Sequence, residues 1–268
     1  MIISNEDIKT LTTCKSKLEN IGAIMHALNY VGDGIEKTTK LLPEKTQKKI
    51  GAKANSILMS VIQANLKTMS KGKLHKEASN KTYKAVVTAS GFGFGLLGFF
   101  GFAADLLVTT KFMMRSILDI ARSKGEDVTD VETQLSCLSV FALGGKSKND
   151  DGVETGYYAT RILLSGSIKK ASVYFAENGL THAVERMALG SPVSQLVAKI
   201  ASRYEMAALE KFAAEGVPIV GAIGGGSINL IFIHHFQKMA EAHFTIRQLE
   251  RKYGEDMIRE KYNEIKVN

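Results

Sequence analysis

Five polar or charged residues stand beside or inside apolar stretches of this 268-residue chain, where side chains of their type could do chemistry. They are Asp105, Arg115, Arg161, Asn229 and His243. A buried ion or amide is destabilising unless it has a partner, so we expect these groups to face one another or a polar cleft. Two interpretations stay open. The first, which we favour, is a structural network that fixes the register of helices; the second is a catalytic cluster formed by the four ionisable residues of the set.

The catalytic interpretation requires a nucleophile or an activated water, a nearby base, and a donor that stabilises an anion. The sequence contains no G-x-S-x-G, H-E-x-x-H or C-x-x-C motif. The pattern G-x-G-x-x-G occurs at 93–98, but its surroundings predict helix and not the strand that a dinucleotide site needs. His235 and His243 lie on one predicted helix, with too few further ligands nearby for a metal site. We therefore expect no cofactor and no metal centre.

The charge of the chain predicts an anionic partner. Lysine and arginine number 35 against 27 acidic residues, which gives a net charge of +8. The excess is concentrated between Lys37 and Lys84, where twelve lysines and no arginine stand against two acidic residues. The anionic face of a membrane is the partner that we expect. Base readout in nucleic acid favours arginine and aromatic residues, in which this segment is poor, so we expect no specific nucleic-acid partner.

An amphipathic helix is predicted within this lysine-rich segment. After Pro43, apolar residues recur at spacings of three and four from Ile50 to Leu66, which is the period of a helix with one buried face. A lysine-rich opposite face can lie against anionic head groups, or it can be the solvated face of an ordinary core helix. The lysines that we expect to bind anions are Lys45, Lys48, Lys49 and Lys53.

Two long uncharged segments are a second feature that points to a membrane. The first run covers residues 85–104 and the second run residues 216–233, and both are rich in glycine. Twenty helical residues rise about 30 Å, which is about the thickness of the hydrocarbon core of a bilayer. Three arrangements stay open: buried central helices packed through their glycines, hairpins that enter one leaflet, and full spans. The aromatic residues of the first run that we expect at the membrane are Phe92, Phe94, Phe99 and Phe100.

The period of the apolar residues predicts an all-α protein. Helices are expected at about 5–21, 50–66, 106–120, 131–143, 154–176, 193–214 and 228–265, with a turn at Gly254. We predict an N-terminal helical segment at 1–34 and a single bundle-like helical domain at 35–268, with two glycine-rich apolar helices or hairpins at its centre. Cys14 and Cys137 are far apart in the sequence and predict a reducing compartment instead of a disulfide framework.

Four segments, in this order along the chain, resemble the EcsC family. They are KFMMRSILDIA at 111–121, CLSVFALGG at 137–145, VPIVGAIGGGSIN at 217–229 and AEAHFTIRQLERKYG at 240–254. The resemblance extends from about Leu42 to Tyr262. It implies a bacterial helical protein linked to the cytoplasmic side of a membrane, and it carries no active site over to this chain. The recurrent polar residues of the family match Arg115, Arg161, Asn229, His243 and Arg247, so Arg247 joins the candidate residues.

These observations lead to one functional hypothesis and two alternatives. The hypothesis is a membrane-associated accessory protein on the cytoplasmic side, at the inner face of the cell membrane, that binds anionic lipid through the lysine-rich segment and the two runs. The first alternative is a hydrolase that acts on a lipid or another amphiphile. The second is an adaptor whose partner is a membrane protein complex.

Overall fold

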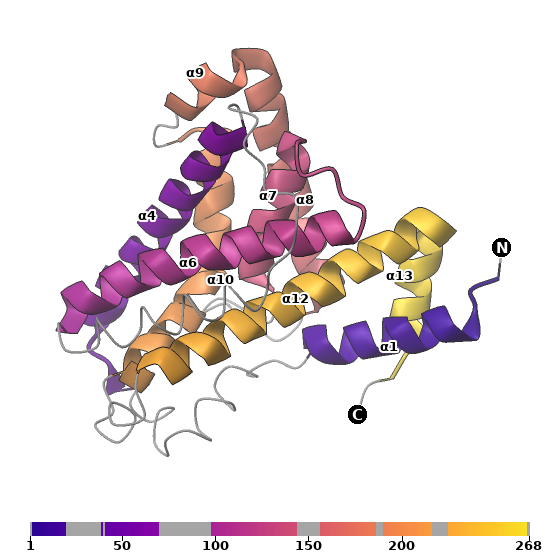
Figure 1. The fold of residues 1–268 in the computed structure, drawn as a ribbon, viewed down its shortest axis with the longest axis horizontal. Helices are drawn as coiled ribbons and strands as arrows, with labels where there is room; N and C mark the ends of the chain where they lie inside the picture. Colours follow the sequence, from indigo (N-terminus) through magenta and orange to yellow (C-terminus); the bar gives the residue numbers. More distant parts are fainter. Residues whose placement is uncertain are drawn as a thin grey trace.

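The structure, a computed structural model, describes residues 2–19, 39, 41–69, 98–143, 156–185, 190–215 and 225–266. Every regular element within these ranges is helical, which confirms the predicted all-α fold (Figure 1). In chain order the elements are α1 (Asn5–Glu19), α4 (Glu44–Met69), α6 (Gly98–Ser123), α7 (Val131–Ser139), the 3-10 helix η2 (Val140–Ala142), α8 (Tyr157–Asn178), α9 (Leu180–Glu185), α10 (Pro192–Glu215), α12 (Gly225–Tyr253) and α13 (Glu255–Glu264).

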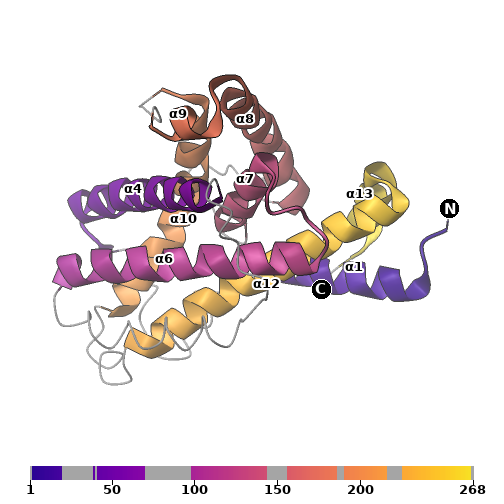
Figure 2. The same ribbon diagram turned by 45° about the horizontal axis from the view of Figure 1, so that its top comes forward.

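The long helices α6 and α12 pack against each other and run in the same direction (Figure 2). Near their N-terminal ends, Asn229 donates a hydrogen bond to Asp105, and further along both helices Gln237 donates one to Ser116. The residue numbers rise together along the two helices, so the pair is parallel. The N-terminal ends of α6 and α12 therefore lie side by side.

Helix α10 crosses this pair in the opposite sense. Lys211, close to its C-terminal end, contacts Asp105, whereas the earlier Tyr204 shares a hydrogen bond with Thr110, further along α6. The C-terminal end of α10 therefore lies beside the N-terminal ends of α6 and α12. We call this part of the molecule the apolar-run end: residues 98–105 of α6, 211–215 of α10 and 225–230 of α12.

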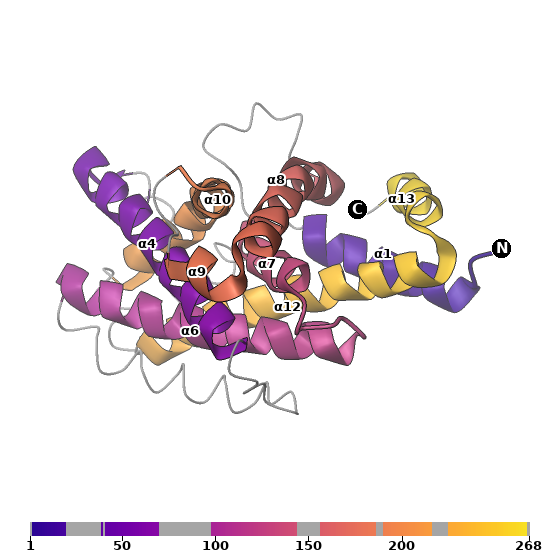
Figure 3. The same cartoon turned by 90° about the horizontal axis from the view of Figure 1, so that it is seen from above.

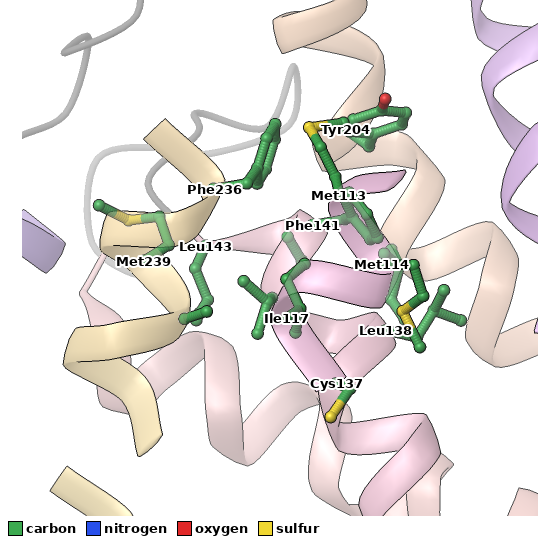
Figure 4. Close-up of a cluster of buried hydrophobic side chains, with 14 of the residues drawn as sticks. Met113, Met114, Ile117, Cys137, Leu138, Phe141, Leu143, Tyr204, Phe236 and Met239 are labelled. Carbon is green, nitrogen blue, oxygen red and sulfur yellow. The ribbon is translucent and has the colours of Figure 1, made fainter. Parts of the chain in front are cut away.

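The core is formed where α6, α7, η2, α10 and α12 meet. Figure 4 shows Met113 and Ile117 of α6 and Phe141 of η2 pointing into one apolar cluster. The ring of Phe141 lies 5.2 Å from that of Tyr204 and 5.1 Å from that of Phe236, measured between centroids. All of these side chains are buried. Their burial removes a large apolar area from water, which is the main favourable contribution to folding.

The amphipathic helix predicted in the lysine-rich segment is present as α4. Its apolar face, from Ile50 to Leu66, is buried, and α4 packs against α10 and α6. Lys45, Lys48 and Lys49 are exposed on the other face. Period alone therefore identified both faces of this helix.

Two glycines follow the ends of long helices, close to where the sequence predicts the end of the helix at 106–120 and the turn at Gly254. Gly125, after α6, and Gly254, between α12 and α13, have positive φ angles of 85° and 95°. Glycine adopts this conformation without the steric strain that a Cβ atom brings. The short helix α9 was not predicted; it follows Gly179, which also has a positive φ.

The helix α1 lies with α13 at the end of the molecule opposite the apolar-run end (Figure 1, Figure 3). It packs on α12 and α13, and Leu11, Cys14 and Leu18 are buried there as part of the main core. The predicted boundary at residue 34 falls outside the described residues, and the division into 1–34 and 35–268 stays a prediction.

Most of the two uncharged runs also falls outside the described residues, including Phe92 and Phe94. The described parts are 98–104 and 225–233, which form the first turns of α6 and α12. Among the helices that the structure describes, none combines the length and the apolar character that crossing a bilayer requires.

Candidate binding pocket between α7, α8 and α12

A pocket of about 250 Å³ lies between α7, α8 and α12; we call it the α7–α8–α12 pocket. Helix α12 contributes His243 and Arg247, which are one turn apart, and α8 contributes Arg161 and Ser165, again one turn apart. Ser136 of α7 lies on the third side. The spacing of four residues on each long helix thus points two polar side chains into the same space.

The remaining wall of the pocket is apolar except for Ser139, and its rim is acidic. Leu143, which follows η2, and Leu164 and Ile168 of α8 supply the apolar surface, and all three are buried. Glu132 of α7 and Glu255 of α13 also line the pocket, and both are exposed. The pocket therefore offers polar donors in its interior and carboxylates where it meets solvent.

His243 is held by a short chain of hydrogen bonds. Arg161 Nη1 lies 3.3 Å from the Tyr157 hydroxyl oxygen, which lies 2.9 Å from His243 Nδ1. A guanidinium can only donate, so the tyrosine oxygen accepts from Arg161. Of the two groups in contact with this oxygen, His243 Nδ1 is the one that can accept its O–H, and we therefore assign the tyrosine as the donor to Nδ1. Nδ1 is then the acceptor nitrogen of a neutral ring, and Nε2 carries the hydrogen.

The neutral state of His243 follows from its surroundings. Burial lowers the pKa of His243 well below its ordinary value, and the charges of Arg161 and Arg247 lower it further. Nε2 is buried and has no hydrogen-bond partner among the described residues. An unpaired buried N–H is destabilising, so a ligand that brings an acceptor to this atom would be stabilised by it.

Both arginines are fixed by glutamates from other parts of the fold. Arg161 donates to both carboxylate oxygens of Glu250, at 2.6 and 3.1 Å, and Arg247 donates to both oxygens of Glu126, at 2.9 Å each. Bidentate pairs of this kind hold the guanidinium plane in one orientation. The Glu126 pair uses Nε and Nη2 of Arg247 and does not involve Nη1.

The pocket is equipped to bind an acceptor group. Nε2 of His243 holds a hydrogen in the tautomer derived above, so it cannot remove a proton from a nucleophile. The hydroxyl of Ser165 already donates to the backbone of Ile162. His243 and Arg247 are thus the donors that this pocket offers to an acceptor group.

A second polar cluster, formed by Asp105, Lys211 and Asn229, lies at the apolar-run end. Asp105 accepts from Lys211 Nζ at 2.5 Å and from Asn229 Nδ2 at 2.8 Å, and all three side chains are buried. Lys211 also pairs with Glu215, one turn later on α10, and burial raises the pKa of Glu215. This cluster ties α6, α10 and α12 together where the two runs attach.

The structure distributes the six candidate residues over separate places. Arg161, His243 and Arg247 line the α7–α8–α12 pocket, whereas Asp105 and Asn229 belong to the second cluster. On α12 alone, Asn229 and His243 are fourteen residues apart, which corresponds to about 21 Å of helix. Arg115 is exposed on α6 and lines neither site.

Sequence reasoning missed Lys211 and Tyr157. A signal for Lys211 was present, because this lysine continues the apolar face of α10 marked by Tyr204, Ala207 and Ala208. A charge at such a position predicts a buried partner. No comparable signal pairs Tyr157 with His243, since the two residues come from helices far apart in the sequence.

The residues expected at a membrane surface are also placed. Lys45, Lys48 and Lys49 line an open depression on α4, where Lys48 pairs with Glu44 at 2.7 Å, and Lys53 is half-buried. Phe99 is half-buried, and its ring centroid lies 6.3 Å from that of Phe212.

The neighbouring Phe100 is 85% exposed. Its ring centroid lies 6.4 Å from that of Phe99, so the exposed ring stands next to one that is packed against the protein. Phe100 is one of the four phenylalanines expected at the membrane, and its side chain is exposed at the apolar-run end.

The cysteines and histidines of the described residues show no arrangement for metal binding. No group of three or more His, Cys, Asp or Glu side chains in this part of the chain could hold an ion. Both cysteines are buried with free thiols, and burial raises the pKa of Cys14 to about 11. A thiol of this kind is a poor nucleophile.

Comparison with known proteins places the chain in one family. The model of the EcsC protein family matches residues 6–249, which include Asp105, Lys211 and Asn229 and every lining residue of the α7–α8–α12 pocket apart from Glu255. Neither the comparison with curated proteins nor that with solved structures gave a match. The match covers most of the chain, and the protein belongs to the EcsC protein family.

Proposed function

We propose that this EcsC-family protein associates with the anionic inner face of the cell membrane, with its apolar-run end directed at the bilayer. The observation that carries the proposal is the direction of three helices. Because α6 and α12 are parallel and α10 opposes them, the described ends to which both uncharged runs attach lie together. The described parts of both uncharged runs, 98–104 and 225–233, thus begin at the same end of the molecule.

Phe100 supports this orientation. Its side chain is 85% exposed, and Leu230 of the same end is 41% exposed. Transfer of a phenylalanine side chain from water to an apolar environment is worth about 1.5–3 kcal/mol. Phe99, whose ring packs against those of Phe102 and Phe212, fixes the backbone from which Phe100 projects.

In this proposal helix α4 contributes to membrane binding through the charge of its lysines and does not insert apolar side chains into the bilayer. Its apolar face is buried in the core, so only its lysines are presented outward. Each lysine near an anionic surface contributes about 1 kcal/mol at physiological ionic strength, and this attraction falls within a Debye length. The proposal therefore combines a salt-sensitive contribution from α4 with a salt-insensitive one from the apolar-run end.

Sedimentation with vesicles tests the proposal. The protein is expected to pellet with vesicles containing anionic lipid, to pellet much less with neutral vesicles, and to be partly released by salt. The triple variant Lys45→Gln, Lys48→Gln, Lys49→Gln should bind less at low salt. Its matched control is Lys169→Gln, Lys170→Gln, Lys199→Gln, which also removes three exposed lysines, two from α8 and one from α10.

Three results would contradict the proposal. They are a protein that stays in the supernatant with anionic vesicles at low salt, equal binding to neutral vesicles, and an equal loss in the control variant. The last result would show attraction by net charge without a defined face.

A further inference from the structure

We propose that the α7–α8–α12 pocket binds a small amphiphilic monocarboxylate. The carboxylate accepts hydrogen bonds from His243 and Arg247, and a short alkyl chain lies against the apolar wall. This inference is independent of membrane association, because the pocket is distinct from the apolar-run end.

The head group is defined by the donors. His243 Nε2 is buried without a partner among the described residues, and we assign the ring hydrogen to it because Nδ1 accepts from Tyr157 in the arrangement derived above. Arg247, one turn later, adds a cation whose position Glu126 fixes. Two donors one turn apart, one of them charged, suit the two oxygens of a carboxylate.

The charge of the ligand is limited by the rim. Each guanidinium of the pocket is already matched by a glutamate, and Glu132 and Glu255 add exposed negative charge. A dianion such as phosphate is repelled by these carboxylates more strongly than a monoanion. The pocket therefore favours one negative charge.

The size and polarity of the rest of the ligand follow from the apolar wall. Leu143, Leu164 and Ile168 are buried around a space of about 250 Å³, which is below the usual range of drug-sized sites. A chain of a few methylene groups fits such a space and removes apolar surface from water. Hexanoate has both features and is the probe that we choose.

Isothermal titration of the full-length protein with three probes tests the proposal. The probes are hexanoate, 1-hexanol and inorganic phosphate, in mildly alkaline buffer where phosphate is mainly a dianion. Hexanoate is expected to bind saturably and at least about tenfold more tightly than the other two probes. Hexanol lacks the charged acceptor, and phosphate lacks the alkyl chain and carries a second negative charge. Absence of saturable hexanoate binding, or binding of hexanol or phosphate at least as tight, overturns the proposal.

Two arginine variants distinguish the pocket from its surroundings. Arg247 and Arg251 both pair with Glu126, but only Arg247 lines the pocket. Arg247→Gln should weaken hexanoate binding about tenfold, and Arg251→Gln should change it less than about twofold. Equal effects of the two variants would show that the ion pair matters only for the fold and would overturn the assignment.

Variants at His243 test the donor itself. His243→Gln keeps an N–H donor near the position of Nε2, whereas His243→Phe removes it. Hexanoate affinity is expected to fall in His243→Phe and to recover in large part in His243→Gln. If both variants fail to fold, Ser136→Leu decides, because it fills the pocket without changing a charge; undiminished binding in Ser136→Leu overturns the proposal.

Discussion

Lys211 of α10 and Asp105 of α6 form an ion pair with an Nζ–Oδ2 distance of 2.5 Å, and neither side chain reaches solvent. The pair lies where the N-terminal ends of α6 and α12 meet the C-terminal end of α10. Buried charges are destabilising unless their partners are fixed, so the pair requires the ends of α6 and α10 to stay together, and the hydrogen bond from Asn229 to Asp105 adds the end of α12. It thereby defines the end of the molecule from which both uncharged runs start.

Removal of Lys211 tests this role. Lys211→Met should lower the free energy of unfolding by about 3–5 kcal/mol, because Asp105 is left buried without its cation. Urea unfolding measures the change, and Lys199→Met, at an exposed position of the same helix, should cost less than about 1 kcal/mol. The double variant Asp105→Asn, Lys211→Met should recover part of the loss. A cost of Lys211→Met no larger than that of the control would contradict the account.

The tautomer of His243 depends on Tyr157. In Tyr157→Phe the hydroxyl that donates to Nδ1 is lost, so the imidazole no longer has a fixed hydrogen on Nε2. We expect a stability loss of about 1–3 kcal/mol and a changed ¹⁵N spectrum of the ring. Tyr158→Phe, which removes a bond to Glu250 but none to His243, is the control and should leave the ring spectrum unchanged. The same spectrum in both variants would refute the assigned tautomer.

The prediction for pH concerns His235, which is buried on α12. Burial lowers the pKa of His235 from 6.5 to about 4. As the pH falls below 6.5, the unfolded chain takes up a proton that the folded protein does not, so stability falls by up to about 3 kcal/mol between pH 6.5 and 4. His235→Gln removes the contribution of this histidine to the pH dependence. The free energy of unfolding of the parent protein should therefore fall towards that of the variant as the pH falls.

Urea unfolding at several pH values checks this prediction. His182→Gln, at an exposed position of α9, serves as the control and should follow the pH profile of the parent protein. If the profiles of the parent protein and His235→Gln run parallel, His235 is not the group responsible.

Two glycines should respond in opposite ways to alanine. Gly166 is exposed in α8, and a Cβ atom there would meet no atom within 4 Å, so Gly166→Ala should raise stability by up to about 1 kcal/mol. Gly254 has a φ of 95°, so Gly254→Ala should lower stability by about 1–2 kcal/mol. Thermal unfolding gives both signs, and a stabilising Gly254→Ala would be inconsistent with the turn between α12 and α13.

The elements were predictable where a local pattern sets them. The buried face of α4 follows from the spacing between Ile50 and Leu66, and the ends of α6 and α12 follow from Gly125 and Gly254. These features depend on residues close together in the sequence, which is why period and glycine identify them.

The two polar clusters were only half predictable. Residue type marked Asp105 and His243 as groups that need partners, but not which partners they have. Lys211 and Tyr157 lie 106 and 86 positions away from these residues, so the pairing depends on how the helices pack. The pocket could not be predicted for the same reason, because its lining residues come mainly from three helices that meet only in the folded protein.

The central claim is that the apolar-run end faces the bilayer, and a single tryptophan tests it most directly. The chain contains no tryptophan, so Phe100→Trp introduces one fluorophore at this end, and Ile162→Trp places one at a 63% exposed position of α8. With anionic vesicles, the account predicts a blue-shifted emission and quenching by brominated lipid for Phe100→Trp, and neither change for Ile162→Trp. Binding to vesicles with an unchanged spectrum in Phe100→Trp, or with equal quenching in both variants, would contradict it.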